Sequence, residues 1–250
     1  MEGFNLEGKI AVITGASRGI GLAAAKKLSQ NGVHCILVSR KIEGLETAVA
    51  EVTAAGGSAQ AMACHMGYPE RIKEMFSTIE KEHGRLDILV NNAAANPHFG
   101  AMLDADEGIW DKVVDVNLKG PFFMTKYAVE LMKEGGAVVN VASVNAVSPG
   151  FFQGIYSASK AALVNMTQTL ARELAPKKIR VNALLPGLTD TKFASAIISS
   201  DDICKMALSQ IPMGRYADPE EMAGAVLYLA SDLASFTTGA SLVCDGGMLI

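Results

Sequence analysis

The chain has 250 residues, with 22 Lys or Arg against 26 Asp or Glu, so its formal net charge at pH 7 is −4. This balance excludes a basic nucleic-acid binder, and a hydrophobic share of 50% excludes a disordered or fibrous chain. Because no linker or low-complexity segment divides the sequence, we expect residues 1–250 to form one domain.

Two periodicities alternate along the chain. Short apolar runs predict strands buried on both faces, and segments with helical periodicity lie between them. The predicted strands are Ile10–Thr14, Cys35–Ser39, Ala59–Cys64, Leu86–Asn91, Ala137–Ala142, Arg180–Leu185 and Ser241–Cys244. The predicted helices are Ile20–Gln30, Leu45–Ala55, Pro69–Glu82, Ile109–Lys133, Ser157–Ala175 and Pro219–Ala230. The alternation predicts an α/β protein with a doubly wound Rossmann fold, in which seven parallel strands carry helices on both faces and ligands bind beyond the strands' carboxyl ends.

A glycine-rich segment, residues 14–21, joins the first predicted strand to the first helix. Gly15 permits a tight turn, Gly19 lets the backbone approach a pyrophosphate, and Gly21 allows close packing of helix on sheet. The N-terminus of the helix favours an anion. A glycine trio alone can mark only a turn, but its position after the first buried strand predicts a dinucleotide site.

The end of the second predicted strand indicates which dinucleotide binds. NAD enzymes place a carboxylate there on the ribose 2′-hydroxyl, whereas this chain has Ser39-Arg40-Lys41. Arg40 and Arg18 can converge on a 2′-phosphate, because planar guanidinium donors suit phosphate oxygens. The alternative is that both arginines are solvated surface charges. We predict NADP(H).

A second constellation lies on the predicted helix 157–175 and the residues before it. Tyr156 and Lys160 are four residues apart and share one helix face. An ammonium group that close is expected to lower the Tyr156 pKa from its usual value of about 10, so that the phenol can act as acid or base. Ser143 lies at the end of the fifth predicted strand, at the same ligand edge of the sheet. Without Ser143, the Tyr-Lys spacing could mark only a helix face.

These motifs, in this order and spacing over nearly the whole chain, resemble those of the short-chain dehydrogenase/reductase family. Short strings around Arg40, Cys64 and Asn96 are similar to its NADPH-dependent carbonyl and retinal reductase branch. The resemblance implies a catalytic tetrad of Asn117, Ser143, Tyr156 and Lys160. It also implies nucleotide contacts from the loops that follow the strands: Gly15, Ser17, Arg18, Gly19, Ile20, Gly21, Ser39, Arg40, His65, Met66, Asn92, Ala93, Ala94, Tyr156, Lys160, Pro186, Gly187, Leu188, Thr189 and Thr191.

The chain departs from the family pattern at two places. Ala94 replaces the last glycine of the family's N-N-A-G segment. His65 stands where many members carry an Asp that meets the adenine, so it is either a ligand of the base or a partly exposed loop histidine.

The resemblance implies hydride transfer between NADP(H) and a carbonyl or alcohol, with Tyr156 exchanging a proton with the oxygen. Ser143 would hold that oxygen, and Lys160 would poise Tyr156 and reach the nicotinamide ribose. Asn117 would position a water that links Lys160 to bulk solvent, or its amide would satisfy a helix kink.

Residues 188–213 have the position of the family's substrate lid. Their apolar side chains, among them Phe193, Met206 and Met213, indicate a hydrophobic carbonyl substrate, although a helix pair packed on the domain would show the same pattern. The candidate substrate contacts are Ser143, Asn145, Phe152 and Tyr156, with Phe99, Phe151 and Ile155 as possible further lining.

Three functions stay open. The first is an NADPH-dependent reductase of ketones or aldehydes, the second a 3-oxoacyl-thioester (acyl carrier protein) reductase, and the third a catalytically silent dinucleotide-binding regulator. Enoyl reduction is disfavoured, because that branch has a wider Tyr-Lys spacing. The second function would need a basic docking patch, for which Arg172, Lys177, Lys178 and Arg180 are the candidates.

The remaining expectations concern partners and location. The small residues Ala158, Ala161, Ala162 and Asn165 offer a surface for a second copy, and the family's usual homodimer or homotetramer would also use residues 239–250. No long apolar run or signal peptide is found, which predicts a cytoplasmic protein without a membrane partner. Four scattered histidines predict no metal site, and Cys35, Cys64, Cys204 and Cys244 predict buried free thiols.

Overall fold

The structure is a computed structural model that describes residues 4–133 and 135–250. Within these residues, seven parallel strands form one sheet in the order β3-β2-β1-β4-β5-β6-β7. The strands are β1 (Ile10–Thr14), β2 (His34–Ser39), β3 (Ser58–Ala63), β4 (Ile88–Asn91), β5 (Gly136–Val141), β6 (Ile179–Pro186) and β7 (Ser241–Cys244). The predicted fold class is therefore confirmed.

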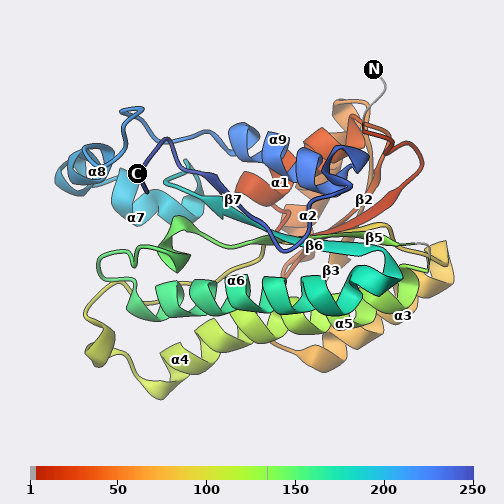
Figure 1. Ribbon diagram of the computed structural model, residues 1–250, viewed down its shortest axis with the longest axis horizontal. Coiled ribbons are helices and arrows are strands. Elements are labelled where there is room, and N and C mark those ends of the chain that lie inside the picture. The colour runs from red at the N-terminus through yellow and green to blue at the C-terminus, as the bar shows by residue number, and fades with distance from the viewer. Residues whose placement is uncertain (1–3, 134) are drawn as a thin grey trace.

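Helices cover both faces of the sheet (Figure 1). One face carries α1 (Gly19–Ser29), α2 (Ile42–Ala54) and α9 (Pro219–Ala230), and the other carries α3 (Pro69–His83), α4 (Glu107–Val114), α5 (Gly120–Leu131) and α6 (Gly154–Leu174). Alternation along β1 explains the two layers. Ala11 and Ile13 belong to the core beneath α1 and α9, whereas Val12 belongs to the core beneath α3 and α5.

The two edge strands differ from the sequence prediction. We expected every strand to be buried on both faces, but β3 and β7 contain no buried residue. Each has a strand neighbour on one side only, so the sheet and its helices cover it incompletely. The prediction is wrong for these two strands and holds for the strands between them.

The predicted helix Ile109–Lys133 is interrupted. Helices α4 and α5 are joined by a π-helical turn, Asp115–Lys119, in which the backbone hydrogen bonds span one extra residue. Asn117 lies in this turn, and its side chain is fully buried. The interruption therefore coincides with one of the residues assigned to the candidate site.

The segment after β6 forms a 3₁₀ turn (Lys192–Ala194) and the short helices α7 (Ser195–Ile198) and α8 (Asp201–Leu208). Figure 1 shows these helices at one end of the molecule, above the N-terminal end of α6 and near the C-terminus. Neither α7 nor α8 contains a buried residue, although both lie wholly within the described chain. Their apolar residues Ile197, Ile198, Ile203 and Leu208 are half-buried, so the two helices pack only partly on the domain.

Two smaller expectations can be compared with the structure. Cys35 and Cys64 are buried free thiols as predicted, whereas Cys204 and Cys244 are free but only partly buried, because they lie on α8 and on the edge strand β7. Among the helices of the described chain, none combines the length and the apolar character that a membrane crossing requires.

Candidate active site

The candidate site lies at the carboxyl ends of the parallel strands. The strand order reverses between β1 and β4, because the chain runs from β1 outward to β3 and then returns to the other side of β1. The loops after these strands therefore diverge and leave a crevice, which is where open α/β sheets bind ligands. The segments after β1, β2, β4, β5 and β6 carry the predicted site residues.

The loop after β1 has the geometry that a pyrophosphate requires. Gly15 and Gly19 have φ values of +66° and +57°, in the left-handed region that favours glycine. A Cβ atom on Gly21 would lie 2.6 Å from the Gly15 carbonyl oxygen and 2.6 Å from Asn92 Nδ2, so no side chain fits there without movement. The first turn of α1 lies wholly within the described residues, and it has neither a side-chain cap nor an acidic residue. Its N-terminal N–H groups are therefore available to an anion. These residues fit a dinucleotide.

The loops after β1 and β4 hold each other in place. Thr14 Oγ1 accepts hydrogen bonds from the backbone N–H groups of Asn92 and Ala93, both at 2.9 Å. In return, Asn92 Nδ2 donates to the Thr14 carbonyl oxygen at 2.9 Å. The segment Asn91-Asn92-Ala93-Ala94 thus supports the loop after β1 through the Asn92 side chain and the backbone N–H groups of Asn92 and Ala93, and the alanine at 94 takes no part in these bonds.

Two cations flank the expected position of the adenosine ribose. Arg18 immediately precedes α1 and Arg40 immediately follows β2, and both residues are exposed. In the described part of the chain, neither guanidinium forms an ion pair with a carboxylate. Both therefore remain available to an anionic ligand.

The four residues of the predicted tetrad come from three segments of the chain: the π turn, the residue that caps the 3₁₀ turn after β5, and α6. Tyr156 and Lys160 lie one turn apart on α6, and Lys160 Nζ is 5.6 Å from the centre of the Tyr156 ring. Ser143 lies just beyond β5, where its Oγ accepts a hydrogen bond from the Asn145 backbone N–H at 3.1 Å. All four side chains are buried or nearly so. Lys160 Nζ donates to the Val141 carbonyl oxygen at 2.8 Å, a contact that the sequence did not indicate.

The pKa of Tyr156 differs from the sequence prediction. We expected Lys160 to lower it, but burial raises the Tyr156 pKa to about 12, and the hydrogen-bonding interaction with Ser143 offsets only part of this rise. Burial also lowers the pKa of Lys160 to about 7, so the amine is only partly charged near neutral pH. The prediction is wrong for the protein alone, because the same burial that brings the two groups together disfavours both charged forms.

Asn117 joins three elements of the site. Its Oδ1 accepts from the Ala95 backbone N–H at 2.7 Å, and its Nδ2 donates to the Ala95 carbonyl oxygen at 2.9 Å. Nδ2 also contacts Ser159 Oγ at 3.1 Å, and that hydroxyl donates to the Tyr156 carbonyl oxygen at 2.6 Å. The amide thus connects the loop after β4 to α6. Our sequence reasoning missed Ser159, although its spacing of three residues from Tyr156 placed it on a neighbouring face.

The loop after β6 closes over the glycine loop. A Cβ atom on Gly19 would lie 3.1 Å from Thr191 Cγ2, so these two predicted nucleotide contacts are neighbours. Thr189 pairs with Ala217 in an isolated β-bridge, and the Gly187 N–H donates to the Cys244 carbonyl oxygen at 2.9 Å. The segment Pro186-Gly187-Leu188-Thr189 is therefore anchored at both ends.

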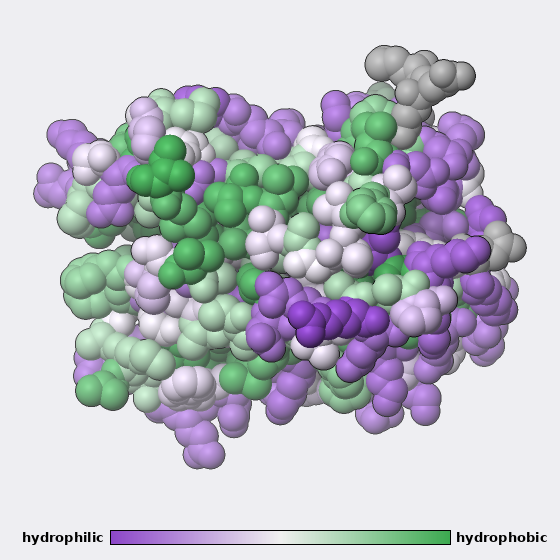
Figure 2. Space-filling model, viewed as in Figure 1, coloured by the Kyte–Doolittle hydropathy of each residue, from purple (hydrophilic) through white to green (hydrophobic). Residues whose placement is uncertain are grey.

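One aromatic ring lies against Tyr156. The Phe193 ring, from the segment after β6, has its centre 5.4 Å from that of Tyr156. Phe152, from the segment between β5 and α6, contacts Phe99 with ring centres 5.9 Å apart and Phe151 with centres 3.9 Å apart, and all three of these rings are exposed. Figure 2 shows hydrophobic residues gathered near the C-terminus and toward the middle of this face, while hydrophilic residues are frequent around α8 and predominate at the end of the molecule opposite α8.

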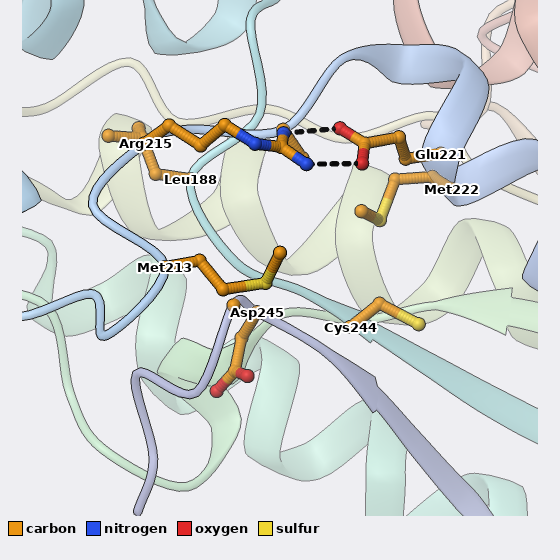
Figure 3. A pocket seen from close by; sticks show the side chains of 9 residues that line it. Leu188, Met213, Arg215, Glu221, Met222, Cys244 and Asp245 are labelled. Carbon is orange, nitrogen blue, oxygen red and sulfur yellow. Dashed lines mark hydrogen bonds and ion pairs between the residues drawn. The ribbon is translucent and has the colours of Figure 1, made fainter.

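A separate hollow of about 170 Å³ lies behind the loop after β6 (Figure 3). Met213, Met222 and Cys244 contribute to its wall, and across it Arg215 forms a two-pronged ion pair with Glu221, with both N–O distances 2.7 Å. No tetrad residue lines this hollow. Leu188, from the loop after β6, also lines it.

Comparison with known proteins places the chain in a family. Residues 15–249 match the family described as Enoyl-(Acyl carrier protein) reductase. Dehydrogenase/reductase SDR family member 4 of Oryctolagus cuniculus is 42% identical, over 97% of this chain and 94% of the relative. The solved structure of a short-chain type dehydrogenase/reductase from Mycobacterium marinum has a TM-score of 0.92 and 34% identity, over 98% of this chain and 97% of that one.

A second solved structure, 3-oxoacyl (acyl-carrier-protein) reductase from Agrobacterium tumefaciens with NADP bound, has a TM-score of 0.91 and 33% identity, over 97% of this chain and 95% of that one. The family match, the full-length similarity and the shared fold lead to one assignment. The chain belongs to the short-chain dehydrogenase/reductase family, and it is an NAD(P)-dependent oxidoreductase that acts on CH–OH groups or the corresponding carbonyls.

Proposed function

We propose that this enzyme reduces a hydrophobic ketone or aldehyde with NADPH. The observation that carries the proposal is a buried Tyr156 phenol that faces Lys160 and Ser143 and lies under the Phe193 ring. A pKa of about 12 keeps this phenol protonated at physiological pH. The protonated phenol is the form that reduction requires, because it can give a proton to a carbonyl oxygen.

Bound NADPH would supply the hydride to the carbonyl carbon. Tyr156 donates its proton to the carbonyl oxygen as that oxygen gains negative charge. The Ser143 hydroxyl donates a hydrogen bond to the same oxygen, and this bond strengthens as the charge develops. Lys160, whose pKa is about 7, can exchange protons near neutral pH and return one to Tyr156 after turnover. Asn117 holds the loop after β4 against α6, the helix that carries both groups, through its hydrogen bonds to Ala95 and Ser159.

The preference for NADP(H) over NAD(H) rests on Arg18 and Arg40. Both are exposed, and the two residues directly after β2, Arg40 and Lys41, offer no carboxylate to accept a hydrogen bond from the 2′-hydroxyl of NAD. The A. tumefaciens relative holds NADP in its solved structure. The residues that would hold the nucleotide are those predicted from the sequence, with the glycine loop at the pyrophosphate and the segment Pro186 to Thr191 at the nicotinamide end.

A 3-oxoacyl-thioester reductase is the second candidate, and the name of the A. tumefaciens relative favours it. The basic patch that would dock an acidic carrier protein is weaker than the sequence suggested. Arg180 donates to the carbonyl oxygens of Leu229 and Ser231, at 2.7 and 3.0 Å, so its guanidinium caps α9. Only Arg172, Lys177 and Lys178 of the four candidates stay exposed. The four-residue spacing of Tyr156 and Lys160 continues to disfavour enoyl reduction.

A substrate panel tests the proposal. Aromatic and aliphatic ketones and aldehydes, a 3-oxoacyl thioester and a keto sugar acid are each assayed with NADPH and with NADH. We expect turnover of the apolar carbonyls with NADPH. Turnover of the thioester alone would favour the second candidate. Nucleotide binding without turnover of any compound would favour a dinucleotide-binding regulator and would overturn the proposal.

Removal of the Phe193 ring tests the apolar substrate class more sharply. Phe193→Ala should raise KM for an aromatic ketone roughly three- to tenfold with little change in kcat, because an aromatic contact is lost but the proton donor remains. Phe236→Ala is the matched control, since that ring is fully exposed in the loop before β7. An unchanged KM in Phe193→Ala, measured by steady-state kinetics, would show that this ring does not contact substrate.

We also propose that the enzyme is a homodimer or homotetramer. Ala158, Ala161 and Asn165 are exposed on α6, and Ala162 is half-buried there, so a second copy can approach this face closely. The edge strand β7 has a free side that can face another subunit within residues 239–250. The cytoplasmic location that the sequence predicts stays a prediction.

A further inference from the structure

His65 leaves the sheet beside Arg40. β2 and β3 are parallel, with Ser39 opposite Ala63, and the Cys64 N–H donates to the Ser39 carbonyl oxygen at 2.8 Å. Adjacent strands lie about 5 Å apart, so the residues that follow these two strand ends emerge side by side. His65 therefore emerges one residue beyond the point opposite Arg40, the cation that we assign to the 2′-phosphate, and is close enough for the Arg40 charge to lower the His65 pKa.

The ring of His65 is held in one orientation. Its Nδ1 accepts a hydrogen bond from the Gly67 backbone N–H at 3.0 Å, and its ring centre is 4.8 Å from that of Tyr68. Because Nδ1 is an acceptor, the proton of the neutral imidazole is on Nε2. The free side of the ring therefore carries a hydrogen-bond donor.

Burial and the nearby charges together favour the neutral form of the His65 ring. Burial lowers the His65 pKa most, and Arg40 and Lys112 lower it further. A hydrogen-bonding interaction with the backbone and the charge of Asp115 in the π turn raise the His65 pKa and offset part of this decrease. Asp115 is itself paired with Lys119 at 2.7 Å. The net effect is a pKa below the usual histidine value, so His65 is an uncharged donor at neutral pH.

We propose that His65 donates its Nε2–H to the 2′-phosphate of NADP(H) and is a determinant of nucleotide specificity alongside Arg18 and Arg40. The proposal rests on the NADP preference given under Proposed function. A carboxylate at position 65 would repel the phosphate, whereas a neutral imidazole with a fixed donor attracts it. A neutral group also avoids adding a third positive charge beside Arg40 when no nucleotide is bound.

Two variants of the full-length enzyme separate the donor from the rest of the ring. His65→Phe removes the donor and keeps an aromatic ring, whereas His65→Gln keeps an amide N–H near the position of Nε2. We measure Kd for NADP and for NAD by isothermal titration calorimetry, and check folding by circular dichroism and Tm. We expect His65→Phe to weaken NADP binding about tenfold or more, as for a hydrogen bond to a charged group, and His65→Gln to restore most of it. Kd for NAD should stay the same in both variants.

The other outcomes overturn the proposal in distinct ways. Equal losses for NADP and NAD would assign His65 to the adenine or to loop structure, and losses for NADP in both variants would mean that the donor is not responsible. Unchanged binding would remove His65 from the site. If His65→Phe does not fold, His65→Asp replaces it and should weaken NADP binding but not NAD binding. A wild-type enzyme that binds NAD and NADP equally would instead contradict the Arg18 and Arg40 assignment, so the two failures are distinguishable.

Discussion

Tyr156→Phe is expected to lower kcat for ketone reduction on the order of 10³-fold and to leave the affinity for NADPH nearly unchanged. The substitution removes one hydroxyl from a ring that stays buried beneath Phe193. Without that proton donor, the alkoxide that forms as hydride arrives can be stabilised only by Ser143 and solvent. The measurements are steady-state kcat with a ketone from the panel and a fluorescence titration with NADPH.

Tyr127→Phe is the matched control for this substitution. Tyr127 lies on α5 and packs against Phe76 and Phe123, away from the tetrad. Its loss should change stability slightly and kcat hardly at all. A Tyr156→Phe enzyme that retains a tenth or more of the wild-type kcat would show that another group supplies the proton.

The second large effect concerns the nucleotide. Arg40→Asp is expected to lower kcat/KM for NADPH on the order of 10²-fold and to raise it for NADH, so that the enzyme prefers NADH. The variant loses a charged hydrogen-bond donor to the 2′-phosphate, places a negative charge beside that phosphate, and gains an acceptor for the ribose 2′-hydroxyl of NADH. Initial rates with both nucleotides at saturating ketone give the ratio directly.

Lys177→Asp serves as the control with the same change in charge, since this exposed residue lies in the turn between α6 and β6. It should leave the ratio of the two efficiencies unaltered. An unchanged ratio in Arg40→Asp itself would mean that Arg40 is a solvated surface charge, which was the alternative left by the sequence.

Local patterns in the sequence were enough to predict the strands of the sheet, but not the incomplete burial of its two edge strands. The run Ile10–Thr14 coincides with β1, because a short apolar segment between helical segments has few other ways to be buried. The run Ser241–Cys244 likewise coincides with β7, although that strand has no buried residue. The incomplete burial of β3 and β7 follows from strand order, which depends on contacts between residues far apart in the chain. No local pattern carries that information.

The π turn at Asn117 also depends on contacts between residues far apart in the chain. The apolar periodicity of residues 109–133 continues through the turn, so it predicts one helix. The interruption accompanies two hydrogen bonds between Asn117 and Ala95, a partner 22 residues earlier that lies after a different strand. The sequence identified Asn117 only through the family resemblance, which did not give its hydrogen-bond partners.

Electrostatics at the site was the hardest part to predict. The spacing of Tyr156 and Lys160 correctly indicated that they share one face of α6, but the direction of the tyrosine pKa depends on burial. Desolvation of both groups outweighs their mutual effect in the protein alone. The position of Phe193 against Tyr156 likewise depends on how residues 188–213 fold back over the sheet edge.

The most direct measurement is a crystal structure of the enzyme with NADP and an unreactive analogue of an apolar alcohol. We predict that Tyr156 Oη donates to the analogue's oxygen at hydrogen-bond distance, with the substrate carbon facing C4 of the nicotinamide ring. A tyrosine hydroxyl that points elsewhere, with protein atoms filling the space between it and C4, would contradict the assignment of Tyr156 as the group that protonates the product.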